Sequence, residues 1–173
     1  MKSMLTSFMV TKIAIFIGPS MVNEDGESNV YLNVDHHQRI YSFAPEAKAT
    51  IVMATVEGDI HDIGKNIVCL MLRNFGYNVV DLGKDVAAAV IVAAAIAHKA
   101  SVIGLSALMT TTMVRMEDTV RLVREQSLAC RVMIGGAVVS QSYADLIGAD
   151  GYADDAVAAV RVATRLCAEV RSA

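Results

Sequence analysis

A histidine with an aspartate two residues before it stands in a polar, glycine-containing stretch of this 173-residue chain. The stretch runs from Glu57 to Asn66, between two apolar runs. If the Asp59 carboxylate accepts the Nδ1 proton of His61, Nε2 is left free as a base or a metal ligand. A second polar stretch, residues 106–112, carries hydroxyl groups that could complete a proton relay. These residue types indicate proton transfer or metal ligation.

Three interpretations of His61 stay open from these residues alone. It is a general base, it is the single protein ligand to a metal that a cofactor carries, or it is a solvated loop histidine capped locally by Asp59 or Asp62. A zinc site built by the protein alone is disfavoured, because the three or four ligands it needs are not visible nearby. Nucleotide hydrolysis is also disfavoured, since neither a P-loop spacing nor GxGxxG follows the first apolar run.

The elements that must position these residues follow from residue 49 onward, where short β-branched runs alternate with helical patterns. Strands are predicted at residues 50–56, 77–83, 101–107, 130–136 and 150–154, as continuous apolar runs typical of strands buried on both faces. Helices are predicted at residues 65–75, 86–99, 113–127, 141–147 and 155–171, the last with Asp154 or Asp155 as its N-cap. The alternation predicts an α/β fold with a five-stranded parallel sheet and helices on both faces. Ligands bind beyond the carboxyl ends of such strands, where the His61 stretch, the 106–112 stretch and Gly135-Gly136 all fall.

The first 48 residues do not fit the alternation, so we divide the chain into an N-terminal extension, residues 1–48, and a domain, residues 49–173. Two strands, Lys12–Ile17 and Asn29–Val34, are predicted to flank a turn at residues 23–26. His36 and His37 follow this hairpin. We interpret them as solvated loop histidines, because adjacent side chains on a strand point in different directions and make a poor metal site.

The composition excludes several classes of protein. With 54% hydrophobic and 19% charged residues the chain is too apolar for a disordered segment, and a net charge of -3 without a basic stripe disfavours nucleic-acid binding. The longest apolar run, residues 86–97, predicts a buried helix rather than a membrane span, which needs about 20 residues. Three cysteines without a CxxC pair, and no cleavage site after the N-terminal apolar residues, favour a cytoplasmic location.

Three separated elements of the chain resemble the cobalamin-binding domain family. Residues 59–64 match its D-x-H-x-x-G signature, Ser106-Ala107-Leu108 match its S-x-L element, and Gly135-Gly136 match the glycine pair that follows after 26 intervening residues. The resemblance covers about residues 48–171. The wider strings GDIHDIGKNIV, GLSALMTTTM and GADGYADDA resemble the corrinoid proteins of methyltransferase systems and the cobalamin module of methionine synthase more than the mutases.

This resemblance implies a flavodoxin-like (Rossmann-like) domain that binds cobalamin or a related corrinoid base-off, with His61 as axial ligand to the cobalt. It also implies a ligand triad of His61, Asp59 and Thr112 that couples coordination to proton uptake. Because a protonated imidazole has no lone pair to donate, protonation would favour four-coordinate Co(I). The cofactor-binding residues that the resemblance implies are Gly58, Asp59, Ile60, His61, Asp62, Gly64, Ser106, Leu108, Thr110, Thr112, Gly135, Gly136 and Ala156.

The function implied by the resemblance is that of a methyl-group carrier between a methyltransferase and an acceptor, a corrinoid subunit rather than a stand-alone catalyst. The implied partners are methyltransferase subunits and a reductive activase, and the oligomeric state stays open. The helical bundle that usually precedes the signature and caps the corrin is not predicted in residues 1–48. Two alternatives therefore remain: a small cobalamin-binding subunit of an adenosylcobalamin-dependent mutase, and a non-catalytic module for cobalamin storage or sensing.

Overall fold

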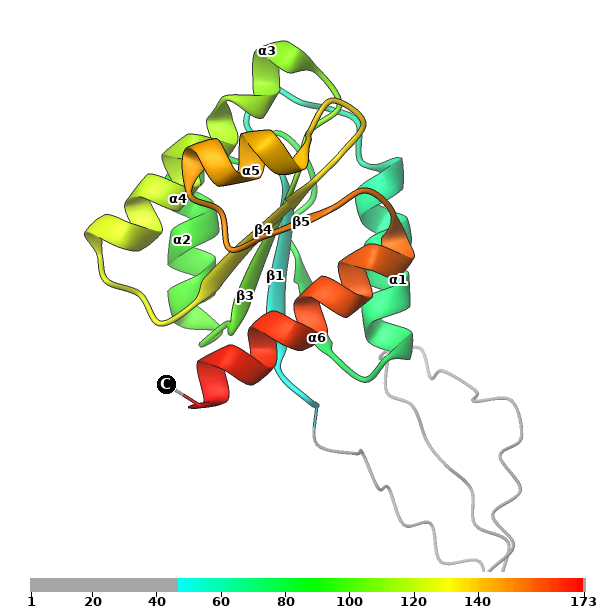
Figure 1. Cartoon of the computed structure of the whole chain (residues 1–173), viewed down its shortest axis with the longest axis vertical. Helices are drawn as coiled ribbons and strands as arrows, with labels where there is room; N and C mark the ends of the chain where they lie inside the picture. The colour runs from blue at the N-terminus through cyan, green and yellow to red at the C-terminus, as the bar shows by residue number, and fades with distance from the viewer. Residues whose placement is uncertain (1–46, 173) are drawn as a thin grey trace, which may run out of the picture. The chain divides into compact units, whose positions relative to one another are not determined.

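The computed structural model describes residues 47–172, and in this range it contains a single parallel sheet with helices on both faces (Figure 1). The strands are β1 (Thr50–Thr55), β2 (Asn78–Asp81), β3 (Val102–Ser106), β4 (Arg131–Gly135) and β5 (Gly151–Ala153). The helices are α1 (Ile63–Asn74), α2 (Ala88–Ala97), α3 (Thr110–Met113), α4 (Arg115–Glu125), α5 (Gln141–Ile147) and α6 (Ala156–Ser172). The predicted fold class, a flavodoxin-like five-stranded parallel sheet, is confirmed.

The strands lie in the order β2-β1-β3-β4-β5, and every neighbouring pair is parallel. Because β1 and β3 are neighbours while the chain leaves them toward opposite edges, the strand order reverses between them. Crevices at such a reversal, beyond the carboxyl ends of the strands, are where open α/β sheets bind ligands. The loops that follow β1 and β3 are therefore the ones placed to build a site.

Two hydrophobic cores lie on the two faces of the sheet. Helices α1 and α6 cover one face, where Leu72 and Leu166 pack with Ile51 of β1. Helices α2, α4 and α5 cover the other face, where Ile91 and Met116 are fully buried. The inner strands β1, β3 and β4 are buried between these layers, which explains why their sequences carry no polar alternation.

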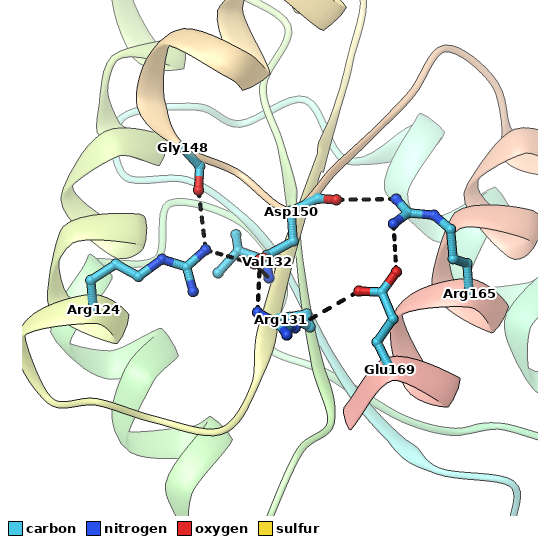
Figure 2. Close-up of polar contacts among 7 residues, drawn as sticks. All are labelled: Arg124, Arg131, Val132, Gly148, Asp150, Arg165 and Glu169. Atoms are coloured by element: carbon cyan, nitrogen blue, oxygen red, sulfur yellow. Dashed lines mark hydrogen bonds and ion pairs between the residues drawn. The ribbon is translucent and has the colours of Figure 1, made fainter. Parts of the chain in front are cut away.

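A network centred on Asp150 joins the amino-terminal ends of β4 and β5 to the helices beside them (Figure 2). The Asp150 carboxylate accepts hydrogen bonds from the N–H of Val132 at 2.7 Å, from Arg124 at 2.9 Å and from Arg131 at 3.3 Å. Arg165 of α6 donates to the main-chain oxygen of Asp150 at 3.1 Å. The network thus holds the start of the short edge strand β5 against β4, α4 and α6.

All five predicted strands form, each trimmed by at most two residues at either end. The last helix begins at Ala156, and the Asp155 carboxylate accepts the N–H of Ala158 at 2.6 Å, so Asp155 is the N-cap. The predicted N-terminal hairpin and the pair His36-His37 lie outside the described residues.

Two predictions about helices are wrong in detail. The helix predicted at residues 113–127 is α4, and a separate short helix, α3, precedes it in what we expected to be a hydroxyl-rich loop. The run expected to be a buried helix buries one face only, with Val90 and Ile96 about half exposed, because α2 packs against the sheet on a single side. Among residues 47–172 no helix is both long enough and apolar enough to cross a membrane.

Candidate functional site

The site lies at the carboxyl ends of β1 and β3, in the loops that lead into α1 and α3. Asp59 is the anchor of this region, because its side chain is completely buried. One carboxylate oxygen, Oδ1, accepts the main-chain N–H of His61 at 3.0 Å and contacts His61 Nδ1 at 2.9 Å. The other oxygen, Oδ2, accepts the N–H of Leu108 at 2.7 Å and that of Met109 at 3.3 Å. A single carboxylate therefore ties the β1 loop to the β3 loop.

The ionisation of Asp59 is set by these donors. Burial would raise the pKa of the Asp59 carboxyl, but hydrogen bonds from the Thr112 hydroxyl and from the N–H groups of His61 and Leu108 outweigh burial. The pKa is held well below its usual range, so the carboxylate is an anion at neutral pH. An anion at this position accepts the Nδ1 proton of His61 and leaves Nε2 with its lone pair.

Thr112 completes a chain of three side chains, two from the β1 loop and one from α3. Its hydroxyl lies 2.7 Å from Asp59 Oδ2, on the opposite carboxylate oxygen from the imidazole. The residue is buried, and it reaches Asp59 because α3 begins directly after the β3 loop and turns residue 112 inward. His61 itself is different, since 45% of its side chain is exposed. The structure thus brings His61, Asp59 and Thr112 together, with only the imidazole open to a ligand.

A cavity of about 550 Å³ adjoins His61 and runs between the sheet and the first turns of α1 and α6. Most of its lining is apolar. Nine of the residues expected to bind a cofactor line it, namely Ile60, His61, Asp62, Gly64, Ser106, Leu108, Gly135, Gly136 and Ala156.

Four of the expected residues do not line the cavity. Asp59 and Thr112 stand behind the imidazole, as described above, and Gly58 lies at the start of the same loop. Thr110 is exposed at the first position of α3.

The residues predicted to bind a cofactor do not include the floor of the cavity. Gly104 lies in the middle of β3, paired in register with Met53 of β1 and Met133 of β4, and all three line the cavity. A Cβ at Gly104 would overlap the Met53 thioether. The space that a side chain at residue 104 would occupy is taken by the flexible ends of Met53 and Met133. A glycine inside a buried central strand is a signal of close approach and could have identified this position.

The two glycines at the end of β4, Gly135 and Gly136, are required by close contacts of the main chain. A Cβ at Gly135 would lie 2.8 Å from the carbonyl oxygen of Ala153, and one at Gly136 would overlap the carbonyl oxygen of Ala107. Gly136 also has a φ of 132°, which L side chains rarely adopt. These glycines let the loops after β3, β4 and β5 approach one another at one wall of the cavity.

Comparison with known proteins gives the family. The B12 binding domain family matches residues 49–161, which is more than half of the chain and includes every residue of the site described above. The chain belongs to the B12-binding domain family. The cofactor predicted from the sequence, cobalamin or a related corrinoid, is thereby confirmed as the cofactor class of this domain.

Relatives within this family carry the word corrinoid in their names. A corrinoid protein of Desulfitobacterium hafniense is 47% identical over 123 residues, which cover 70% of this B12-binding chain and 57% of that protein. Dimethylamine corrinoid protein 3 of Methanosarcina mazei is 47% identical over 131 residues, covering 72% of this chain and 78% of that one. The chain therefore spans a little over half of the first relative's length.

A solved structure, that of the methanol:cobalamin methyltransferase complex of Methanosarcina barkeri, has the same fold at 39% identity. Its TM-score is 0.68, and the match covers 72% of this chain and 48% of that one.

The site's own geometry fits a corrinoid better than a bare metal ion. Among the described residues no group of three or more His, Cys, Asp or Glu side chains could hold a metal, so His61 stands alone as a candidate ligand. A metal that brings its own equatorial nitrogens needs only one protein ligand. The adjoining cavity, mostly apolar and floored by Gly104, offers space for an organic substituent of such a cofactor.

Proposed function

We propose that this B12-binding domain holds a corrinoid through the Nε2 atom of His61 and serves as a methyl-group carrier. The observation that carries the proposal is the imidazole itself: half-exposed beside a large apolar cavity, and fixed at Nδ1 by a buried anion. A loop histidine that served solvation alone would not need a fully buried carboxylate behind it. When bound, the corrinoid supplies the cobalt centre that accepts and releases the methyl group.

The residues of the chain then have distinct tasks. Asp59 holds the Nδ1 proton of His61 and so presents the Nε2 lone pair outward. Thr112 keeps its hydroxyl proton directed at Asp59 Oδ2, 2.7 Å away, which stabilises the anion. Ser106 offers a hydroxyl within the cavity, whose lining is mostly apolar and also includes Asp62, Lys65, Asp154 and Asp155. Protonation of the imidazole at Nε2 would remove the ligand, which couples axial ligation to proton uptake.

The names of the relatives support a carrier role. They are corrinoid proteins associated by name with dimethylamine, and a solved neighbour is a methanol:cobalamin methyltransferase complex. We accordingly propose a methyltransferase subunit as partner, with a reductive activase as a second partner. No observation on this chain favours the mutase subunit or the storage module over the carrier. All three cysteines are free and buried, which agrees with a reducing cytoplasmic location.

The ligand role is tested by titrating the purified apoprotein with hydroxocobalamin and recording absorption spectra. We expect the wild-type protein to give a base-off, histidine-ligated spectrum, and His61→Ala to lose the histidine-ligated bands. His98→Ala is the matched control, because His98 is exposed at the end of α2, in the loop at the opposite ends of the strands. Identical spectra for all three proteins would refute axial ligation by His61.

The carrier role needs a second experiment. The reduced holoprotein is incubated with a dimethylamine or methanol methyltransferase and its ¹⁴C-labelled methyl donor, and then separated by gel filtration. Radioactivity that elutes with this protein, and is absent for His61→Ala, is the expected result. Failure of both methyltransferases to label a correctly ligated holoprotein would contradict the proposed carrier role.

A further inference from the structure

One residue near the site has a main-chain conformation that the fold alone does not explain. Among the described residues, three other than glycine have a positive φ: Asp85 at 56°, Lys99 at 49° and Ser127 at 50°. Lys99 and Ser127 each lie two residues beyond a helix, α2 and α4, where the left-handed conformation is a common way to end a helix. Asp85 lies between β2 and α2 and ends no helix. Left-handed conformations of this kind are maintained only where surrounding contacts require them.

The contacts of Asp85 supply the reason. Its carboxylate Oδ1 accepts the N–H of Gly58 at 2.7 Å, and its own N–H donates to the carbonyl oxygen of Asp59 at 3.0 Å. The two hydrogen bonds lie on either side of the Gly58–Asp59 peptide and form a reciprocal clamp across 27 positions of sequence. Asp85 therefore contacts the main chain of the residue whose side chain anchors His61.

Asp85 itself is carried by a rigid support. Beyond the end of β2, the chain continues to pair with β1: Thr55 donates its N–H to Gly83 at 2.9 Å, and Val86 donates to Thr55 at 3.1 Å. Asp85 lies between these two fixed points. The segment that holds the clamp is thus an extension of the sheet rather than a free loop.

The clamp adds to a turn hydrogen bond at the near end of the His61 loop, from the Asp59 N–H to the Val56 carbonyl oxygen at 3.1 Å. At the far end of that loop, the Lys65 ammonium is buried and pairs with the Asp81 carboxylate at 2.5 Å, which ties the first turn of α1 to the end of β2. At the near end stands Gly58, with a φ of 80°. A Cβ at Gly58 would meet Thr112 Cγ2 at 3.5 Å, an ordinary contact, so the glycine is explained by its φ and not by a close approach. Its N–H donates to the Asp85 carboxylate.

We propose that Asp85 is a positioning residue for axial ligation: it fixes the Gly58–Asp59 peptide, and through the Asp59 carboxylate it sets the orientation of His61. This inference rests on the proposed function, in which His61 is the ligand. The carboxylate of Asp59 must meet donors from two loops at once, and rotation of the flexible Gly58 peptide would move it away from them. Removal of a group that hydrogen-bonds a metal-binding histidine typically changes metal affinity about 10- to 100-fold, and Asp85 acts one contact further from the histidine, so the lower end of this range applies.

Three substitutions at Asp85 separate the contribution of its acceptor oxygen from that of its positive-φ conformation. Asp85→Asn keeps an acceptor oxygen and a side chain that tolerates positive φ. Asp85→Gly keeps the conformation without strain but deletes the acceptor. Asp85→Ala deletes the acceptor and adds the strain. Lys99→Gly is the control, because it changes a positive-φ residue at the end of α2, away from the His61 loop.

Each variant is reconstituted with hydroxocobalamin at pH 7, and its histidine-ligated fraction and dissociation constant are measured by absorption. Circular dichroism and thermal unfolding of the apoproteins establish that the variants are folded, as expected for changes at an exposed residue. We expect Asp85→Gly and Asp85→Ala to bind about tenfold more weakly with a reduced histidine-ligated fraction. Asp85→Asn should restore wild-type behaviour, and Lys99→Gly should not differ from wild type.

The outcomes distinguish this inference from the function on which it rests. If the His61→Ala spectrum differs from wild type while Asp85→Gly and Asp85→Ala match wild type in spectrum and affinity, His61 is the ligand and the role of Asp85 is refuted. If His61→Ala matches wild type, the proposed function itself fails. A loss that Asp85→Asn does not rescue would also overturn the inference, because the acceptor oxygen would not be the cause.

Discussion

Replacement of Thr112 by valine tests the buried hydrogen-bond chain without requiring any cofactor. Valine has nearly the same shape as threonine, so the substitution removes the hydroxyl that lies 2.7 Å from Asp59 Oδ2 while leaving the packing in place. Asp59 stays buried and keeps its charge, but one of its donors is lost. The perturbation therefore removes one contact of the anion that holds His61, together with the 3.0 Å contact of the same hydroxyl with the Met109 carbonyl oxygen.

The magnitude follows from the remaining contacts of Asp59. A hydrogen bond to a charged group contributes about 1.5–3 kcal/mol to stability. Because Oδ2 keeps the N–H of Leu108 at 2.7 Å and the N–H of Met109 at 3.3 Å, the anion is not left without partners. We expect the free energy of unfolding to fall by about 2 kcal/mol, and the melting temperature by about 6 °C for a domain of this size.

Thr112→Ser is the matched control, since it keeps the hydroxyl and loses one methyl group. Burial of a methyl group contributes about 0.8 kcal/mol, so the serine variant should lose less stability than the valine variant. Urea unfolding of the apoproteins, followed by circular dichroism at pH 7, measures the free energy of unfolding of wild type and of both variants. A valine variant as stable as the serine variant, or more stable, would refute the claim that the hydroxyl stabilises the Asp59 anion.

Three further predictions concern the apoprotein. Gly136→Ala should destabilise the apoprotein by about 3 kcal/mol or more, because the new Cβ overlaps a main-chain oxygen at a residue with positive φ. Gly64→Ala is the control and should unfold like wild type, because its Cβ meets nothing within 4 Å. Equal urea midpoints for the two variants would contradict the close approach at Gly136. The Asp59 pKa lies below its unfolded value of about 3.9, so its contribution to stability is complete above that pH and is lost as pH falls through the folded pKa. The difference in unfolding free energy between wild type and Asp59→Asn should accordingly be largest near neutral pH and narrow below about pH 4, and a difference that grows on acidification would be inconsistent with an ionised Asp59. Burial, with the nearby Asp81 charge, raises the pKa of the Cys69 thiol to about 11, so iodoacetamide at pH 8 should label this cysteine only in denaturant, as read by mass spectrometry; rapid labelling of Cys69 in the native protein would show that it is not buried.

The fold could be predicted from the sequence because the inner strands of a parallel sheet have a recognisable sequence pattern. A strand buried on both faces is a continuous apolar run, and β1, β3 and β4 are such runs. The orientation of α2 could not be predicted, because ten consecutive alanine, valine and isoleucine residues carry no amphipathic signal. Helix α3 was missed because three threonines have low helix propensity, and the turn forms through contacts of residues 112 and 113 with the carbonyl of Met109.

The site could be predicted only where its contacts are local in sequence. The pairing of Asp59 with His61 follows from a spacing of two residues, and the structure places Asp59 Oδ1 and His61 Nδ1 within hydrogen-bond distance. The N–H groups of Leu108 and Met109 could not be predicted, because main-chain donors leave no trace in residue types. Lys65 would ordinarily be read as a solvated helix residue, and its burial depends on Asp81, which the sheet brings across from β2.

The central claim, that Nε2 of His61 is the axial ligand of the corrinoid, is tested most directly by electron paramagnetic resonance of the protein loaded with cobalamin and reduced to cobalt(II). Protein labelled with ¹⁵N-histidine is compared with unlabelled protein, and His61→Ala with both. If His61 is the ligand, we expect superhyperfine splitting that changes from a triplet to a doublet on labelling and is lost in His61→Ala. A triplet that persists in the labelled protein, or a spectrum that His61→Ala leaves unchanged, would contradict this claim.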